Sequence, residues 1–218
     1  MNSTTFATTL EIVSDIVCPW CYIGKRRLDR ALELLGSDNP ITVRWKPYEL
    51  NPKMPPGGLD RKSYYARKFG SSAYAEDLIA NITANAHDDG LPMEYANIKR
   101  VPNTRTAHRL IWLAEQFDCQ DAIVDALFQA YFVEGSNIED RMVLFNIAVS
   151  TGISDEVVNK FLGGDEALDI IATEVKAAQD AGIQGVPAFV LNGHFLFSGA
   201  QSPETISLTI KRAIAKGL

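Results

Sequence analysis

The spacing of apolar positions divides the chain into a β-rich start, a helical middle and a β-rich end. Residues 9–17 are rich in Ile and Val, with apolar side chains on both faces, so they predict a strand buried inside a sheet. From Cys18 the period changes, and apolar or small residues recur every three or four positions as far as Leu35. This spacing predicts a helix that stops at Gly36. A second strand is predicted over residues 41–50, which completes a βαβ unit.

The middle of the chain has a helical period and the end returns to a β period. A Pro- and Gly-rich loop leads into residues 61–182, which are predicted to be almost entirely helical. Two short apolar runs then flank Asn192 and Gly193, a pair that favours a two-residue type I′ hairpin turn. A last helix is predicted from Pro203. The order β-α-β, helices, α-β-β-α therefore predicts an α/β fold with an all-helical piece inserted in its middle.

Composition and charge narrow the class of protein. The 218 residues are 46% hydrophobic and 22% charged, which is typical of a folded soluble domain. The net charge of −6 argues against a nucleic-acid partner, because such proteins carry a basic face. No apolar stretch approaches the ~20 residues of a membrane span, and no Lys or Arg of a secretory signal precedes Lys25. We expect a cytoplasmic protein with no membrane association.

The candidate chemistry lies in Cys18-Pro-Trp-Cys21, at the predicted junction of strand and helix. Zinc is disfavoured because the remaining cysteine, Cys119, and the three histidines show no ligand spacing, so we expect no metal. A permanent disulfide is disfavoured by a reducing cytoplasm and by the shortness of the loop it would close. Two reduced cysteines that serve as small buried hydrophobes would suit Cys21, which lies on the apolar stripe, better than Cys18.

A redox pair explains the junction. In the first helical turn, unpaired backbone N–H groups and the helix dipole favour a thiolate at Cys18, and Cys21 lies one turn deeper, where it can resolve a mixed disulfide. Pro19 suits the first helical position. Trp20 would contact a substrate or simply pack on the surface. Asp15 would accept a proton from Cys21 or, as we favour, bond locally at the strand end.

Six segments together resemble the thioredoxin-like DsbA family, and most of all its cytosolic FrnE-like branch: SDIVCPWCYIGKRR, WKPYELNP, NTRTAHRL, ALFQAYFVEG, GVPAF and SGAQ. The resemblance implies an α/β, DsbA-like fold, in which a thioredoxin-like domain (1–58 and 166–218) is split by an all-helical domain (59–165). It also implies a protein disulfide oxidoreductase or isomerase with Cys18 and Cys21 as catalytic residues. The partners would be disulfides and thiols of proteins or small molecules.

The same resemblance implies a cis Val186–Pro187 peptide beside the redox pair. The backbone of Val186 would then pair with an extended substrate. Pro19 and Trp20, which lie between the two cysteines, are predicted substrate contacts together with Val186 and Pro187. Secreted oxidants of the family have Pro-His between their cysteines, so Pro-Trp implies a milder, more reducing pair.

Two other functions stay open at this point. The kappa-class glutathione transferases and 2-hydroxychromene-2-carboxylate isomerases share the split fold, but they use serine where Cys18 stands and bind glutathione. By that resemblance Asn103 would face a ligand and glutathione would serve as a co-substrate, although Asn103 also suits a helix cap and His108 a packed position. A redox-inert binding module is the second alternative.

Three further predictions concern the whole protein. Apart from the redox-active disulfide, no cofactor is expected. Cys119 is predicted to be structural, at a helix end. Both a monomer and a homodimer are compatible with the sequence.

Overall fold

The computed structural model describes residues 8–36 and 40–218. Among them, four strands form the main sheet: β1 (Thr8–Ser14), β2 (Ile41–Pro47), β5 (Ala188–Leu191) and β6 (His194–Ser198). Their order is β2-β1-β5-β6, with β1 parallel to β2 and antiparallel to β5, and β5 antiparallel to β6. Thus β1 lies inside the sheet, as its two apolar faces predict.

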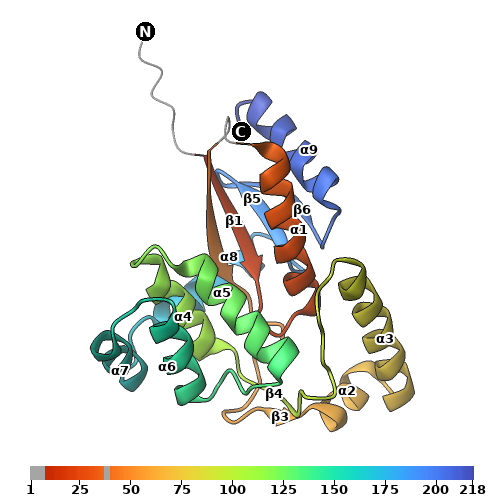
Figure 1. Ribbon diagram of the computed structural model, residues 1–218, viewed down its shortest axis with the longest axis vertical. Coiled ribbons are helices and arrows are strands. Elements are labelled where there is room, and N and C mark those ends of the chain that lie inside the picture. Colours follow the sequence, from red (N-terminus) through yellow and green to blue (C-terminus); the bar gives the residue numbers. More distant parts are fainter. Residues whose placement is uncertain (1–7, 37–39) are drawn as a thin grey trace.

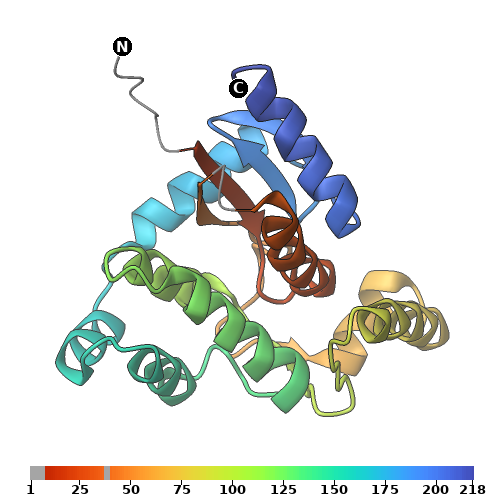
Figure 2. The ribbon, with the colours of Figure 1, turned by 45° about the horizontal axis from the view of Figure 1, so that its top comes forward.

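Helices cover both faces of this sheet (Figures 1 and 2). Helix α1 (Pro19–Leu35) packs against α9 (Pro203–Ala215) on one face. Helix α8 (Leu168–Asp180) lies on the other face and contacts β2. The chain runs along β1 toward the helical part of the molecule and reverses into α1, so the first turn of α1 faces that helical part.

The inserted helices form two groups that flank the lower end of the sheet in Figure 1. One group is the α2–α3 pair and the other contains α4 to α7. A two-stranded ribbon of β3 and β4 lies between them. The domain boundaries at residues 59 and 165 stay a prediction. The bounds of these elements are β3 (Leu59–Asp60), α2 (Arg61–Phe69), α3 (Ser72–Asp88), β4 (Arg100–Val101), α4 (Arg105–Glu115), α5 (Gln120–Gln129), η1 (Ala130–Glu134), α6 (Arg141–Ser150) and α7 (Asp155–Gly163).

Local sequence signals placed several boundaries correctly. Helix α1 ends at Leu35, and Gly36 follows with a φ of 73°, a left-handed value that favours glycine. The β5–β6 hairpin turns at Asn192 and Gly193, whose φ angles of 48° and 82° are both positive, as a type I′ turn requires.

Three predicted spans were too long. The first strand, predicted over 9–17, ends at Ser14, and the second, predicted over 41–50, ends at Pro47. In both places the apolar pattern continues beyond the strand, into a buried turn after β1 and into a partly buried loop after β2, and alternation alone cannot distinguish these from a strand. The helical middle is interrupted between α3 and α4 by a non-helical stretch with Pro and Gly, and this stretch contains β4.

An aromatic cluster joins the sheet domain to the inserted helices. The run predicted as a helix buried nearly all round forms α5 and its π-helical continuation η1. Phe128 and Phe132 from this run are fully buried. Tyr22 of α1 stacks on both rings, with centroid distances of 5.3 and 5.6 Å. Because these rings come from both parts of the chain, one continuous core supports the first turn of α1.

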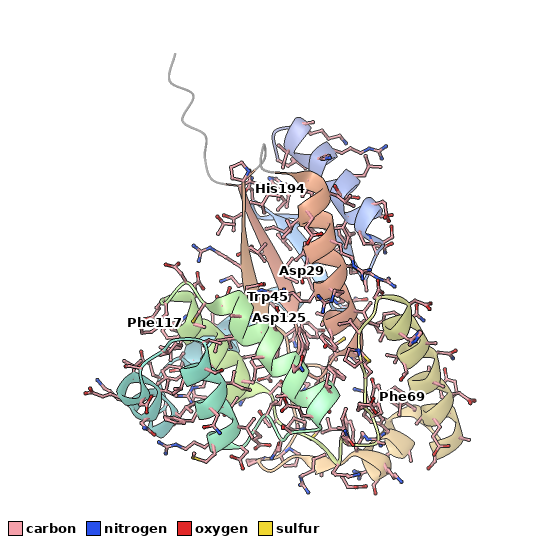
Figure 3. All side chains as sticks on the ribbon, viewed as in Figure 1. Asp29, Trp45, Phe69, Phe117, Asp125 and His194 are labelled. Carbon is pink, nitrogen blue, oxygen red and sulfur yellow. The ribbon has the colours of Figure 1, made fainter. Side chains whose placement is uncertain are left out.

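Charged contacts hold α1 to the helices around it. The Nζ of Lys25 lies 2.8 Å from Asp29 and within 3.4 Å of two aspartates of α5, although the Lys25 side chain is only 3% exposed. Figure 3 shows Asp29 and Asp125 close together between α1 and α5. On the other side of α1, Arg27 donates to Asp89, just after α3, at 2.7 Å. Within residues 8–36 and 40–218, no helix is long and apolar enough to cross a membrane.

Candidate active site

Cys18 occupies the N-cap position of α1. After β1 ends, its backbone N–H donates to the carbonyl of Asp15 at 2.9 Å, and its own carbonyl accepts from the N–H of Cys21 at 3.0 Å. Its backbone is extended (φ −88°, ψ 113°), and its side chain caps no N–H group. The sulfur therefore lies at the positive end of the helix dipole, where the predicted strand-to-helix junction was expected to place it.

The Cys18 sulfur contacts Val186, which lies 168 positions later in the chain. The Sγ of Cys18 donates a weak hydrogen bond to the carbonyl oxygen of Val186 at 3.6 Å. The Val186–Pro187 peptide bond is cis. The ring of Pro187 packs so closely on α1 that a Cβ atom added at Gly24 would lie 2.8 Å from its Cγ. The glycine thus lets α1 approach the Val-Pro segment.

Cys21 lies behind Cys18 and is more deeply enclosed, with 1% of its surface exposed. Burial raises the pKa of its thiol well above the ordinary value of 9.0, and the hydrogen bond and negative charge of Cys18 raise it further. Neither Cys18, Cys21 nor Cys119 is in a disulfide. In the reduced protein, Cys21 is therefore a neutral thiol at neutral pH.

The Cys18 sulfur faces a cavity rather than open solvent. We expected an accessible sulfur, but the residue is only 5% exposed, and side chains of the inserted helices α2 and α3 line the cavity beside it. The cavity has a volume of about 360 Å³. Its floor contains Cys18, Pro19, Trp20 and Val186, and access to the sulfur runs through this space.

The wall opposite the cysteine is aromatic and aliphatic. It includes Tyr65, Lys68 and Phe69 of α2, together with apolar residues of α3, and Figure 3 places Phe69 at the α2–α3 side. Burial raises the pKa of Tyr65 to about 12, so its phenol stays neutral. No sequence pattern identified this wall, because a helical stripe that faces a cavity has the same period as one that faces a core.

Lys68 brings a positive charge to the rim of the cavity. Its Nζ donates to the side-chain oxygen of Asn51 at 2.8 Å and lies 5.6 Å from the centre of the Tyr64 ring. Partial burial lowers the pKa of Lys68, an effect that the negative charges of Asp15 and Cys18 partly oppose. The negative charges near Lys68 therefore offset only part of the cost of burying its ammonium group.

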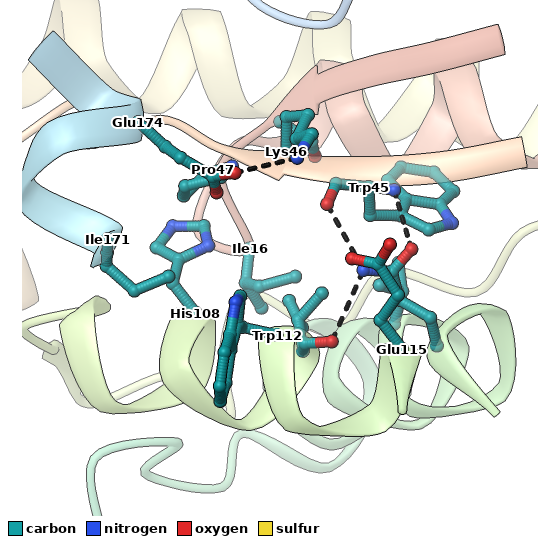
Figure 4. Close-up of a pocket in the computed structure, with 13 residues that line it drawn as sticks. Ile16, Trp45, Lys46, Pro47, His108, Trp112, Glu115, Ile171 and Glu174 are labelled. Atoms are coloured by element: carbon teal, nitrogen blue, oxygen red, sulfur yellow. Dashed lines mark hydrogen bonds and ion pairs between the residues drawn. The ribbon is translucent and has the colours of Figure 1, made fainter. Parts of the chain in front are cut away.

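Asp15 lies just beyond the strand end, but its carboxylate contacts distant segments of the chain, so the local bonding that we favoured is wrong. Its Oδ2 accepts from the backbone N–H of Leu50 at 2.7 Å, and its Oδ1 lies 3.5 Å from the Nε2 of His108. That nitrogen is also 2.9 Å from the carbonyl oxygen of Tyr48, so His108 is a packed histidine. Figure 4 shows its ring beside a small cavity of about 10 Å³, which has room for about one water molecule.

Two other residues from the sequence analysis lie away from the sulfur pair. Asn103, predicted to bind substrate, does not line the Cys18 cavity. Its amide nitrogen donates to the carbonyl of Met54 at 2.7 Å, and its side-chain oxygen accepts from the N–H of Arg105, the first residue of α4, at 3.0 Å. Cys119 lies at the start of α5, half-buried. Within the described residues, no group of three or more His, Cys, Asp or Glu could hold a metal ion.

Known proteins share this fold. The family described as DSBA-like thioredoxin domain matches residues 9–211. SCO1869 from Streptomyces coelicolor, described as a probable DsbA oxidoreductase, is 29% identical, with a TM-score of 0.87 over 95% of this chain and 90% of that one. The uncharacterized protein YwbO from Bacillus subtilis (strain 168) is 25% identical over 92% of this chain and 94% of its own. The cytosolic disulfide reductase DsbM from Pseudomonas aeruginosa, solved with GSH, shares the fold at 20% identity and a TM-score of 0.62 over 96% and 98% of the two chains.

Proposed function

Because this chain belongs to the family of DSBA-like thioredoxin domains, we propose that it is a thiol–disulfide oxidoreductase or isomerase acting through Cys18 and Cys21. The observation that carries the proposal is the position of the Cys18 sulfur. It lies at the N-terminus of α1, 3.6 Å from the carbonyl of Val186, and on the floor of a cavity. A sulfur kept only for packing would not need access to such a space.

The exchange begins at Cys18. As a thiolate, it attacks one sulfur of a substrate disulfide, a new S–S bond forms, and the other substrate sulfur leaves with the bonding electrons. Cys21 then loses its proton and attacks the Cys18 sulfur, which releases the second substrate thiolate and leaves a Cys18–Cys21 disulfide. Because burial raises the pKa of Cys21, its proton leaves only when a base is at hand, and the departing substrate thiolate can accept it.

The backbone beside the sulfur orients the substrate in this proposal. Val186 places its carbonyl next to Cys18, and Pro187 holds that segment against α1. Pro19 and Trp20 line the same cavity. We therefore assign substrate contacts to Pro19, Trp20 and Val186 and a supporting position to Pro187, and we no longer include Asn103, whose amide is engaged elsewhere.

Glutathione is a second candidate partner. The support for it is the likeness to DsbM, a protein solved with GSH, which agrees with a cavity beside Cys18 that is large enough for a small thiol. A cysteine at position 18, rather than serine, favours disulfide exchange over glutathione conjugation or isomerisation. The same relative is cytosolic, and we propose a cytoplasmic location for this chain as well.

The test is catalysis of insulin reduction by dithiothreitol. We expect the protein to accelerate this reaction and Cys18→Ser to return the rate to that of dithiothreitol alone. Cys119→Ser is the matched control, since Cys119 lies at the start of α5 rather than in the cavity, and it should retain the activity. Cys21→Ser should accumulate a mixed disulfide on Cys18 that mass spectrometry can identify. Equal rates with wild-type protein and Cys18→Ser would reject the proposal.

A further inference from the structure

The Cys18 cavity contains a lysine but no carboxylate. Among the described residues that line it, Lys68 is the only basic one, and no aspartate or glutamate is present. The phenols of Tyr65 and Tyr95 do not balance that charge, since burial raises the pKa of both and keeps them neutral. A ligand in this space therefore meets one lysine ammonium group and no carboxylate.

The positive charge continues beyond the rim. A groove of about 550 Å³ adjoins the cavity and shares Leu50, Asn51 and Lys68 with it. The groove adds Lys53 and Arg67, and again no carboxylate among its described lining residues. An anionic group on Lys68 would thus lie between the cavity and a basic groove, where it can accept charge-assisted hydrogen bonds.

The remaining surface of the cavity is apolar. The side chains opposite Cys18 include Phe69, Leu78, Ile79 and Ile82, with Trp20 beside the sulfur. Such a wall favours a hydrocarbon or aromatic body and offers little to a peptide-like one. Oxidised glutathione carries two ammonium groups as well as carboxylates, and an ammonium group that enters this cavity finds no carboxylate among the described lining residues.

We propose that the Cys18 cavity selects small disulfides and thiols that have an apolar body and an anionic end, and that Lys68 binds this end. The inference rests on the proposed function, since it concerns the substrate of the same cysteine. The carboxylate or phosphate of the substrate binds the Lys68 ammonium at the rim, and the apolar body lies against α2 and α3. The substrate sulfur then reaches Cys18, which forms a mixed disulfide with one half while the other half leaves as a thiolate. Lys68 is a specificity residue in this step, and no atom is transferred to it.

Two aromatic disulfides that differ in charge test this inference. In a Cys21→Ala, Cys119→Ala background, Cys18 is the only cysteine left to react. The rate of mixed-disulfide formation would be measured by stopped flow with 5,5′-dithiobis(2-nitrobenzoate), which is anionic, and with 4,4′-dithiodipyridine, which is neutral. Each rate is divided by the rate of the same probe with free mercaptoethanol, which removes differences in intrinsic reactivity. Oxidised glutathione is measured in the same way.

We expect Lys68→Gln to lower the anionic-to-neutral rate ratio about fivefold, the effect of losing about one charge-assisted contact at a partly exposed site. Lys68→Arg should keep the ratio. Lys62→Gln is the matched control, because Lys62 lies on the same helix but outside the cavity, and it should also keep the ratio. A general effect of Lys68 on thiolate reactivity would slow both probes equally and leave the ratio unchanged.

The inference is overturned if Lys68→Gln leaves the ratio unchanged while Cys18 still reacts. It is also overturned if the normalised rate with oxidised glutathione equals or exceeds that of the anionic aromatic probe. In both cases the proposed exchange function stands. If Cys18 reacts with none of the three disulfides, the proposed function itself fails.

Discussion

Replacing Gly24 by alanine tests the close approach of α1 to the Val-Pro segment. Gly24 lies in the second turn of α1, and its φ is outside the left-handed region, so helix propensity alone favours alanine by about 1 kcal/mol. The structure opposes this gain. The new Cβ would lie 2.8 Å from the Cγ of Pro187 and 3.6 Å from its Cβ. The first distance is well below ordinary van der Waals contact, and a proline ring cannot rotate away.

The net effect follows from the two opposing terms. Overpacking of a filled site costs about 1–3 kcal/mol, and the rigid ring places Gly24→Ala in the upper part of that range. Subtracting the propensity gain of about 1 kcal/mol leaves a net loss of about 1–2 kcal/mol in the free energy of unfolding. Because the carbonyl of Val186 precedes the displaced ring, its 3.6 Å contact with Cys18 should lengthen as well.

Urea unfolding of the reduced protein measures the first effect, and the reaction rate of Cys18 with 4,4′-dithiodipyridine measures the second. Gly163→Ala is the control, since an added Cβ there meets only the flexible end of Arg141 at 3.8 Å. We expect the control to keep or raise the stability and Gly24→Ala to lower the midpoint urea concentration. If Gly24→Ala raised the stability by about 1 kcal/mol, propensity would be the whole effect and the close packing that we infer would be refuted.

Further expectations concern the buried ionisable groups. Under reducing conditions, the free energy of unfolding should fall as the pH rises above 9.0, since burial holds the pKa of Cys21 higher in the folded state and the unfolded chain therefore loses that proton first. Cys21→Ala should flatten this alkaline limb in urea titrations at several pH values, and an unchanged slope would contradict the assignment. Lys25→Met should lower the stability by about 1–3 kcal/mol, because three aspartates lose a buried cation but two of them are more than half exposed. Lys176→Met removes a surface pair with Asp180 and should cost about 0–0.5 kcal/mol, so equal losses in the two lysine variants would argue against a special role for Lys25.

Local chemistry explains why several elements could be predicted. The stop of α1 at Gly36 and the turn at Asn192 and Gly193 depend on backbone angles that few residue types adopt readily. The N-cap position of Cys18 follows from the change of period at one point in the chain. Each of these features depends on residues within one or two turns of one another, so each can be read without knowledge of the rest of the fold.

Predictions that depended on distant parts of the chain were less successful. Asn103 lies on a segment that resembles part of a ligand cleft, yet its side chain bonds to Met54 and to the start of α4. The sulfur that we expected to be accessible is nearly buried, beside a cavity that α2 and α3 help to line. The period of a helix tells which side chains share a face, but it does not tell whether that face meets a core, a cavity or solvent.

The sequence by itself therefore determined the order of elements, the turn that places Cys18 at a helix N-terminus and the position of Cys21 one turn behind it. Only the tertiary structure decided what surrounds these sulfurs: the Val186 carbonyl from the far end of the chain, the aromatic wall from the inserted helices, and Lys68 at the rim. The physical reason is that backbone preferences act over a few residues, whereas a cavity forms where surfaces from distant segments meet and leave a gap.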